Sequence, residues 1–302
     1  MIKSIKVTNY LNDSITLELM RPDLSGFIVK TIDGLGPAKA SINTSEIATA
    51  DGGVYNSARL DTRNIVFDLE FMQTKTESIE DIRLKSYKYF PIKKPVRLTI
   101  ETDNRLLETE GYVESNEPNI FSKNEGTRIS IICPDPYLYS KNISTNDFNS
   151  IEPMFEFPFG TEENHDPYTL GEINILTTAN VIYEGDATIG IDIIIHALGS
   201  VSSITIVNTL TNEHMVINTT KLASMTSSGI KAGDTIIITT QIGNKSVTLI
   251  RDGVETNILN CLDRGFTWFT LNKGDNIFAY TAEEGSINVQ FCVKNKIAYE
   301  GV

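Results

Sequence analysis

The stretch RNIVFDLEFMQTKTESIEDIRLKSYKYFPIKKPVRLTI, residues 63–100, decides the fold of the first half of this chain. It begins and ends with alternating apolar and polar residues, which is the two-residue period of a strand with one buried face. The alternating apolar positions at its start are Ile65, Phe67, Leu69 and Phe71, and those at its end belong to Val96–Ile100. The stretch therefore predicts two half-buried strands with a different element between them.

That middle element, Glu77–Phe90, is predicted as a helix. Thr74 precedes Glu77 by three residues, the spacing at which a cap and a carboxylate satisfy each other's backbone donors. Four apolar residues follow at near-helical spacing and predict one buried stripe: Ile79, Ile82, Tyr87 and Phe90. Pro91 ends the helix because the residue before a proline is pushed out of the α region. One helix among strands indicates an α+β domain.

Working outward, further strands are expected in residues 1–30, at Leu107–Ser115 and at Thr127–Cys133. Residues 38–64 are polar and poorly periodic, with a turn at Asp51-Gly52-Gly53. They are expected to form a long exposed loop, and such a loop in a compact domain is usually functional.

These segments carry a resemblance to a known family. The runs TIDGLGPAKASINTSEIATADGGVYNSARLDTRNIVFDLEF (31–71), YKYFP (87–91), KKPVRLTIETDNRLLETEGYVESNEPNIFSKNEG (93–126) and ISIICPDPYLYS (129–140) keep one order of elements. In that order they resemble the distal tail proteins of long-tailed bacteriophages, over roughly residues 27–140.

The resemblance implies a hexameric ring that joins the tail tube to the tail tip. The implied partners are other copies of the chain, a tail tube protein, a tail-tip or hub protein and a receptor-binding protein. In the family an excursion such as residues 38–64 lies near ring contacts, so this segment is the expected assembly surface.

A domain boundary is expected near residues 140–152, giving an N-terminal domain of residues 1–140 and a C-terminal domain of residues 141–302. Ten short strand patterns follow the boundary, at a spacing typical of an all-β sandwich. They are Met154–Phe159, Ile173–Leu176, Val181–Tyr183, Thr188–Ala197, Ser203–Asn208, His214–Asn218, Thr235–Thr240, Ser246–Ile250, Asn276–Ala282 and Ile287–Val293. In the family this domain is often a galectin-like, jelly-roll sandwich. The predicted fold is mainly β with one helix.

Charge and composition narrow the function classes. The net charge of −13 argues against nucleic acid, whose phosphates need Lys and Arg. Residues 141–302 carry −10 of that charge, with 19 acidic against 9 basic residues, which is read as solubility. Neither a signal peptide nor an apolar run long enough to span a bilayer is recognisable, so synthesis in a host cytoplasm and no membrane insertion are expected.

No catalytic or cofactor motif is found. Cys133, Cys261 and Cys292 lack metal or disulfide spacing and are expected as buried thiols. Gly34 and Gly36 lack the features of a phosphate-binding loop. The acidic run Glu162–Asp166 contains ligand types for a hard cation without the spacing of a calcium loop, and a solvated loop is the interpretation. An enzyme, a cofactor and a metal are all predicted absent.

Trp268, the single tryptophan, is the one candidate for carbohydrate binding. An exposed indole could stack on a sugar ring, whereas strand alternation over Phe266–Thr270 would pack Phe266 and Trp268 together in the sandwich core. Burial in the core is the prediction.

The resulting hypothesis is a structural protein of a phage or prophage tail. Two alternatives stay open: a carbohydrate-binding module for attachment to the host cell wall, and a baseplate component of a contractile tail or tailocin.

Overall fold

The computed structural model describes residues 1–48, 51–153 and 171–302. The chain divides into two compact units: unit 1 comprises Met1–Asn142 and Ala298–Val302, and unit 2 comprises Ile143–Ile297. Residues 298–302 thus return to unit 1, a return that the expected division at residue 140 does not include. The expected strand Met154–Phe159 and the acidic run Glu162–Asp166 lie outside the described residues.

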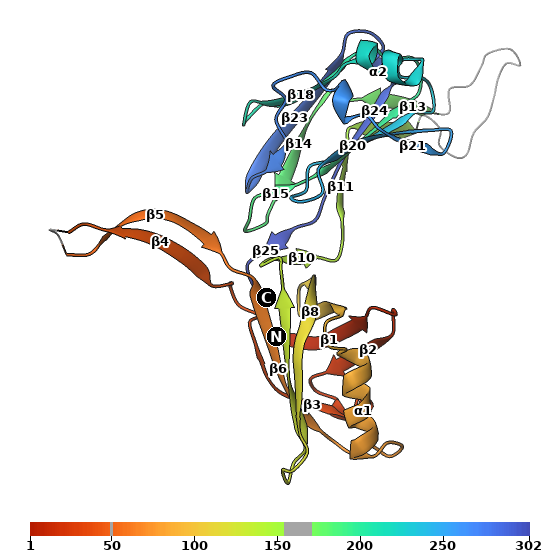
Figure 1. The fold of residues 1–302 in the computed structure, drawn as a ribbon. Coiled ribbons are helices and arrows are strands. Elements are labelled where there is room, and N and C mark those ends of the chain that lie inside the picture. Colours follow the sequence, from red (N-terminus) through yellow and green to blue (C-terminus); the bar gives the residue numbers. More distant parts are fainter. Residues whose placement is uncertain (49–50, 154–170) are drawn as a thin grey trace, which may run out of the picture. The chain divides into compact units, whose positions relative to one another are not determined.

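Unit 1 is built on a nine-stranded sheet (Figure 1). Seven strands run in the order β2-β1-β7-β8-β9-β6-β3, with β10 beside β8 and β25 beside β10. Their bounds are β1 Ile2–Asn9, β2 Ser14–Glu18, β3 Phe27–Asp33, β6 Arg63–Phe71, β7 Pro95–Thr102, β8 Leu106–Asn119, β9 Gly126–Cys133, β10 Leu138–Ser140 and β25 Ala298–Tyr299. Each pairing in this sheet is antiparallel.

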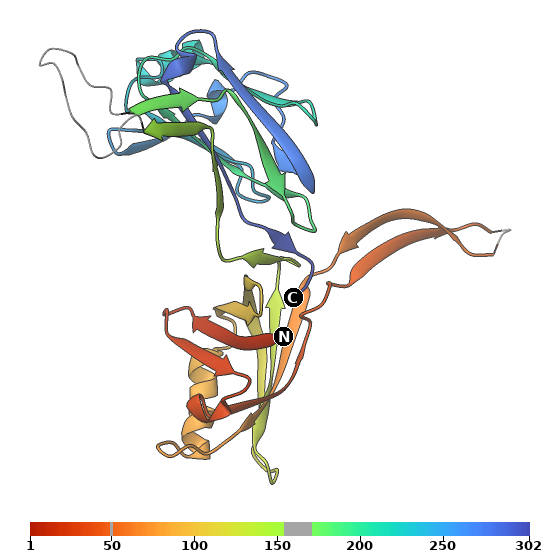
Figure 2. The ribbon, with the colours of Figure 1, turned by 180° about the vertical axis from the view of Figure 1, so that it is seen from behind.

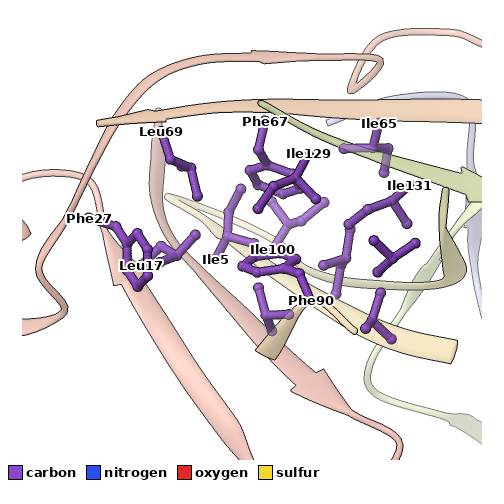
Figure 3. Close-up of a cluster of buried hydrophobic side chains, with 14 of the residues drawn as sticks. Ile5, Leu17, Phe27, Ile65, Phe67, Leu69, Phe90, Ile100, Ile129 and Ile131 are labelled. Carbon is purple, nitrogen blue, oxygen red and sulfur yellow. The ribbon is translucent and has the colours of Figure 1, made fainter. Parts of the chain in front are cut away.

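The alternation of buried and more exposed residues along β6 sets the core of unit 1. Ile65, Phe67, Leu69 and Phe71 on β6 are all buried, as predicted. β9 adds Ile129 and Ile131 to the same cluster, because its residues pair in register with β6. Figure 3 shows the β6 side chains up to Leu69 and the two β9 isoleucines gathered on one side of the sheet, with Phe90 and Ile100 among them.

Helix α1 (Ile79–Tyr89) confirms the predicted helix but begins two residues later than expected. Its capping box is Ser78 with Asp81, since the Ser78 hydroxyl accepts from the Asp81 backbone N–H and the Asp81 carboxylate accepts from that of Ser78. The expected pair of Thr74 and Glu77 is therefore wrong. Thr74 instead accepts from the Glu77 N–H and closes the turn that leads into the helix.

The predicted buried stripe of α1 is wrong at Tyr87. Ile82 and Ser86 are buried, whereas Tyr87 is 42% exposed. At 3.6 residues per turn, Tyr87 lies about 140° around the helix from Ile82, so both cannot face the sheet. The sheet-facing series continues through Ser86, whose hydroxyl donates to the Arg83 carbonyl, to Phe90.

Residues 38–64, expected as an irregular loop, form a two-stranded hairpin of β4 (Ala40–Glu46) and β5 (Gly53–Leu60). Neither face of this hairpin is buried against the rest of unit 1. Its sequence therefore lacks the alternation of apolar and polar residues from which a strand is predicted.

Unit 2 is a β-sandwich, as predicted. A six-stranded sheet has the order β11-β24-β16-β19-β20-β21 and a four-stranded sheet the order β14-β23-β17-β18, with ribbons β12-β13 and β15-β22. The bounds are β11 Ser144–Asp147, β12 Asn149–Pro153, β13 Gly171–Ile175, β14 Thr178–Tyr183, β15 Ile189–Gly190, β16 Asp192–Ala197, β17 Ile204–Asn208, β18 Glu213–Ile217, β19 Thr235–Thr239, β20 Ser246–Arg251, β21 Val254–Asn257, β22 Thr270–Leu271, β23 Gly274–Ala282 and β24 Val289–Asn295.

The two large sheets meet through aromatic side chains. Tyr280 on β23 stacks on Phe291 of β24 with ring centroids 4.9 Å apart, and Phe148 packs edge-on against Phe291 at 4.7 Å. The Tyr280 hydroxyl donates to the Val289 carbonyl across the same core, and burial raises the pKa of Tyr280 to about 12. Strands that alternate buried and exposed residues have one apolar face, and the two sheets bury these faces against each other.

Unit 2 also contains a helix that was not predicted, α2 (Thr219–Thr226). The Asn218 side chain caps it by accepting from the N–H groups of Thr220 and Lys221. The helix has eight residues and buries only Leu222, so its sequence shows no apolar stripe. Short 3-10 turns lie at Pro22–Leu24, Leu259–Cys261 and Ser286–Asn288. Neither described α-helix has the length and hydropathy needed to cross a membrane.

Candidate assembly surface

The β4–β5 hairpin stands away from the sheet of unit 1 (Figures 1 and 2). Its two strands pair with each other from Ala40↔Leu60 to Glu46↔Gly53, and with no other strand among the described residues. Every residue of β4 is exposed, and so is every residue of β5 except Leu60. An isolated two-stranded hairpin is marginally stable in water, so this one lacks the packing that normally holds such an element.

The hairpin exposes apolar side chains as well as unpaired strand edges. Ile42, Val54 and Tyr55 are 65%, 48% and 63% exposed. The side-chain hydrogen bonds along it are between polar groups at the surface, such as Asn56 to Ser45. Unpaired edges combined with exposed apolar residues are features that proteins either protect or use for association. The hairpin is thus the best candidate in unit 1 for a surface that another chain covers.

Arg63 lies at the root of this hairpin, where β5 gives way to β6. Its side chain is 2% exposed and donates to backbone carbonyl oxygens alone. Nε reaches Pro136 at 2.8 Å, Nη1 reaches Gly34 and Gly36 at 2.6 Å each, and Nη2 reaches Glu300 at 2.6 Å. We call this set of contacts the Arg63 clasp. It joins three segments that are distant in sequence.

The local backbone is shaped to present these carbonyls. Gly34 has φ +85°, and a Cβ there would lie 1.9 Å from the Asn64 carbonyl oxygen, so a larger residue does not fit. Burial lowers the pKa of Arg63, yet a guanidinium stays charged under ordinary conditions. Its planar fork of five N–H donors suits several fixed carbonyls better than a lysine would. The carbonyls of Gly34 and Gly36 thus serve as acceptors for Arg63.

The clasp was missed in the sequence, although a signal exists. Arg63 has the same parity as Ile65, Phe67 and Leu69, so the alternation of β6 places its side chain on the buried face. An arginine that continues an apolar series in a strand needs buried acceptors. The sequence does not say which acceptors, because they come from residues 34–36, 136 and 300.

The exposed Tyr87 lines a shallow groove between the end of α1 and β8. Phe90, Ile92, Asn116 and Pro118 complete it, with a volume of about 420 Å³. The Asn116 side chain, one of the lining residues, donates to the Ser86 carbonyl. Its lining is mainly apolar and carries no group suited to catalysis.

Trp268 is neither buried in the sandwich core, as predicted, nor fully exposed, as a sugar-stacking indole would be. It lies in an irregular segment before β22, not in a strand, and its side chain is half-buried. Thr267 anchors the segment, because its N–H donates to the His214 carbonyl and its hydroxyl oxygen accepts from the His214 N–H. Phe266 and Trp268, on either side of it, turn to the same side. Phe266 packs edge-on against the indole at 5.4 Å, and the Lys245 ammonium lies 5.5 Å from its ring centre. Phe269 points the other way and is buried.

The other candidates show no built site. Within residues 1–48, 51–153 and 171–302, no cluster of three or more His, Cys, Asp or Glu side chains could hold a metal. Cys133 and Cys261 are buried and Cys292 is half-buried, all as free thiols, and burial raises the pKa of each.

Solved structures with this architecture cover nearly the whole chain. The crystal structure of the Dit protein of phage SPP1, titled a paradigm of the hub adsorption apparatus in phages infecting Gram-positive bacteria, gives a TM-score of 0.65 at 12% identity, covering 97% of this chain and 98% of its own. The chain shares the Dit fold. The phage P2 baseplate, in its activated conformation with Ca, gives a TM-score of 0.53 at 14% identity with both chains fully covered. No protein-family model matches the sequence, nor does any curated protein.

The Dit fold extends further than the sequence resemblance did. The resemblance reached residues 27–140, whereas the structural match includes unit 2 as well. The predicted resemblance to distal tail proteins is therefore confirmed at the level of the fold. Identities of 12–14% establish architecture and leave the partners to other observations.

Proposed function

We propose that this chain is a non-enzymatic structural protein of a phage or prophage tail. Six copies form a ring at the distal end of the tail, with the tail tube protein on one side and the tail-tip or hub protein on the other. Unit 1 makes the ring, and each copy carries its own unit 2, available to a receptor-binding protein or a cell-wall saccharide. The Dit fold shared with a hub protein and a baseplate supports this assignment.

The observation that carries the proposal is the β4–β5 hairpin. It is ordered as a strand pair over seven registered positions, yet nothing in its own unit covers it. Such a hairpin gains stability when a neighbour covers its apolar residues or pairs with its edge. A contact from the hairpin of one copy to a different surface of the next is heterologous, and heterologous contacts close into a ring when the rotation permits.

Sedimentation velocity on the full chain and on a shortened hairpin tests the proposal. The shortened variant lacks residues 43–57 and joins Ile42 to Ala58, which pair in the native register, through an Asn-Gly turn. The full chain is expected to approach six copies with increasing concentration, while the shortened variant stays monomeric with unchanged thermal unfolding. A full chain that remains a monomer at high concentration would overturn the ring.

A pair of point variants separates a specific contact from general stickiness. Tyr55→Ser removes an exposed aromatic from the hairpin, and Phe121→Ser removes the most exposed aromatic of the β8–β9 turn, at 63% and 96% exposure. The first is expected to weaken self-association and the second to leave it unchanged. Equal effects would contradict an interface centred on the hairpin.

A second candidate is carbohydrate binding by unit 2, favoured by the half-exposed Trp268 beside Phe266. An indole with one accessible face can stack on a sugar ring, although Lys245 lies over this ring. Titration of neutral and anionic cell-wall saccharides, followed by tryptophan emission, tests it. If unit 2 binds no saccharide, the emission stays unchanged, which is the expected result and leaves the ring proposal intact. A saturable change would support binding, whether in a tail or in a contractile-tail baseplate.

A further inference from the structure

The Arg63 clasp sits where both strands of the hairpin leave the sheet. Gly34 and Gly36 lie between β3 and β4, and Arg63 is the first residue of β6, directly after the connection from β5, so one guanidinium links the two places where the hairpin joins the sheet. A second bond, from the Asp61 N–H to the Lys39 carbonyl at 2.9 Å, closes the same root. The direction in which the hairpin leaves unit 1 is therefore fixed by a few contacts at this point.

The remaining side of the clasp comes from the far end of the sequence. The Glu300 carbonyl accepts from Arg63 Nη2, and the Val302 N–H donates to the Leu35 carbonyl at 3.1 Å. Ala298 is fully buried, and β25 pairs with β10 beside the root (Figure 1). Residues 298–302, which we call the return segment, thus contact the connection into β4 directly.

The return segment supplies one of the hydrogen-bond acceptors of the Arg63 guanidinium. Arg63 is 2% exposed, and a buried donor that loses its acceptor is costly. If the return segment leaves, Nη2 loses the Glu300 oxygen and Leu35 loses its backbone partner. Arg63 would then turn toward water and release Gly34 and Gly36.

We propose that the return segment acts as an intramolecular latch that orders the root of the β4–β5 hairpin through Arg63. Unit 1 is completed only after the chain has passed through unit 2 and come back. A chain without a docked return segment loses β25, keeps the rest of its sheet and holds its hairpin loosely. The consequence for assembly rests on the proposed function of the hairpin, whereas the coupling within one copy does not.

Gly301 offers a way to loosen the latch without changing Arg63. A Cβ at this position would lie 3.2 Å from the Gly36 backbone, so Gly301→Val pushes the return segment away from the root. Gly36→Ala is the matched control, because a Cβ there meets nothing within 4 Å. Arg63→Lys keeps the charge but removes the fork and tests the clasp from the other side.

Hydrogen–deuterium exchange on the full-length variants at low concentration reads the coupling in one copy. Gly301→Val and Arg63→Lys are expected to speed exchange about tenfold or more in peptides covering residues 36–62, with Gly36→Ala unchanged. Peptides from β8 and β9 report that the sheet is intact. Faster exchange of residues 298–302 with unaltered protection at residues 36–62 would overturn the latch.

Sedimentation velocity on the same variants tests the consequence for assembly. Gly301→Val is expected to shift self-association to higher concentration, and Gly36→Ala to leave it unchanged. If the wild-type chain stays monomeric, the proposed ring fails while the exchange result still decides the latch. If the chain forms its ring and exchange shows no coupling, the latch fails alone.

Discussion

Each unit contains one arginine that joins several segments, and the two are satisfied differently. Arg63 in unit 1 donates to four backbone carbonyls and has no carboxylate among these partners. Arg251 in unit 2 forms a bidentate pair with Asp234, at 2.8 and 2.5 Å, and also donates to Ser228 and to the Gly229 carbonyl. The first depends on backbone positions alone, and the second on a titratable partner.

Because their partners differ, the contacts of the two arginines respond differently to pH. Carbonyl oxygens do not titrate, so the Arg63 clasp is insensitive to pH and depends on where residues 34–36, 136 and 300 lie. The Asp234 pair ties the segment after α2 to β19 and β20, and it weakens when the carboxylate is protonated. Because Trp268 is the single tryptophan, its emission follows unit 2, whereas far-UV circular dichroism follows both units.

The largest effect is expected from Arg63→Leu. The variant loses four hydrogen bonds from a buried charged group, and each such bond contributes roughly 1.5–3 kcal/mol, so unit 1 should lose about 4 kcal/mol or more. In urea the circular dichroism signal should gain an early phase while tryptophan emission keeps its midpoint. The exposed Arg97→Leu on β7 is the control. A shift in the emission midpoint would contradict independent units.

Arg251→Leu should reverse that pattern at a somewhat smaller cost. Breaking a largely buried ion pair by removing one partner costs about 3–5 kcal/mol, because the other charge is left unpaired. The tryptophan midpoint in urea should fall while the phase from unit 1 stays, and the exposed Arg264→Leu should change neither. The double variant with Asp234→Leu should lose less than Arg251→Leu, since no buried charge remains.

Lowering the pH should have a moderate effect on the stability contributed by the Arg251 pair and no effect on that contributed by the Arg63 clasp. Burial raises the pKa of Asp234, but hydrogen bonds from Arg251 and from the Lys231 backbone outweigh it, so the pKa lies below its ordinary 3.8. The pair's stabilisation is complete above that ordinary value and is lost as the pH falls through the lower folded value. The stability difference between wild type and Asp234→Asn, read by emission, should shrink in that range. The deficit of Arg63→Leu should not change.

The smallest effect concerns the reporter itself. Lys245→Ala removes the ammonium over the Trp268 ring, so acrylamide should quench the emission more efficiently while the urea midpoint stays the same. Wild-type quenching should be intermediate, as the half-buried indole requires. Strong protection from acrylamide would instead match the core position that strand alternation predicted.

Much of the fold could be predicted because its strands and its first helix follow from patterns within short segments. Alternation at Ile65, Phe67 and Leu69 gave a buried strand face, and the periodic apolar residues before Pro91 gave a helix. The exact cap was harder, since Thr74 and Ser78 both lie three residues before a carboxylate and only the local backbone distinguishes them. Helix α2 was missed because a single buried residue, Leu222, leaves no period to detect.

The sequence by itself determined the class of the molecule: mainly β, with a helix-bearing first part and a sandwich after it. These follow from short-range periods, which each segment carries within itself. Only the tertiary structure decided that residues 38–64 form an uncovered hairpin, that Trp268 is half-buried, and that residues 298–302 complete unit 1. Those outcomes depend on contacts such as Arg63 with Glu300, 237 residues apart, and no local pattern specifies a partner at that distance.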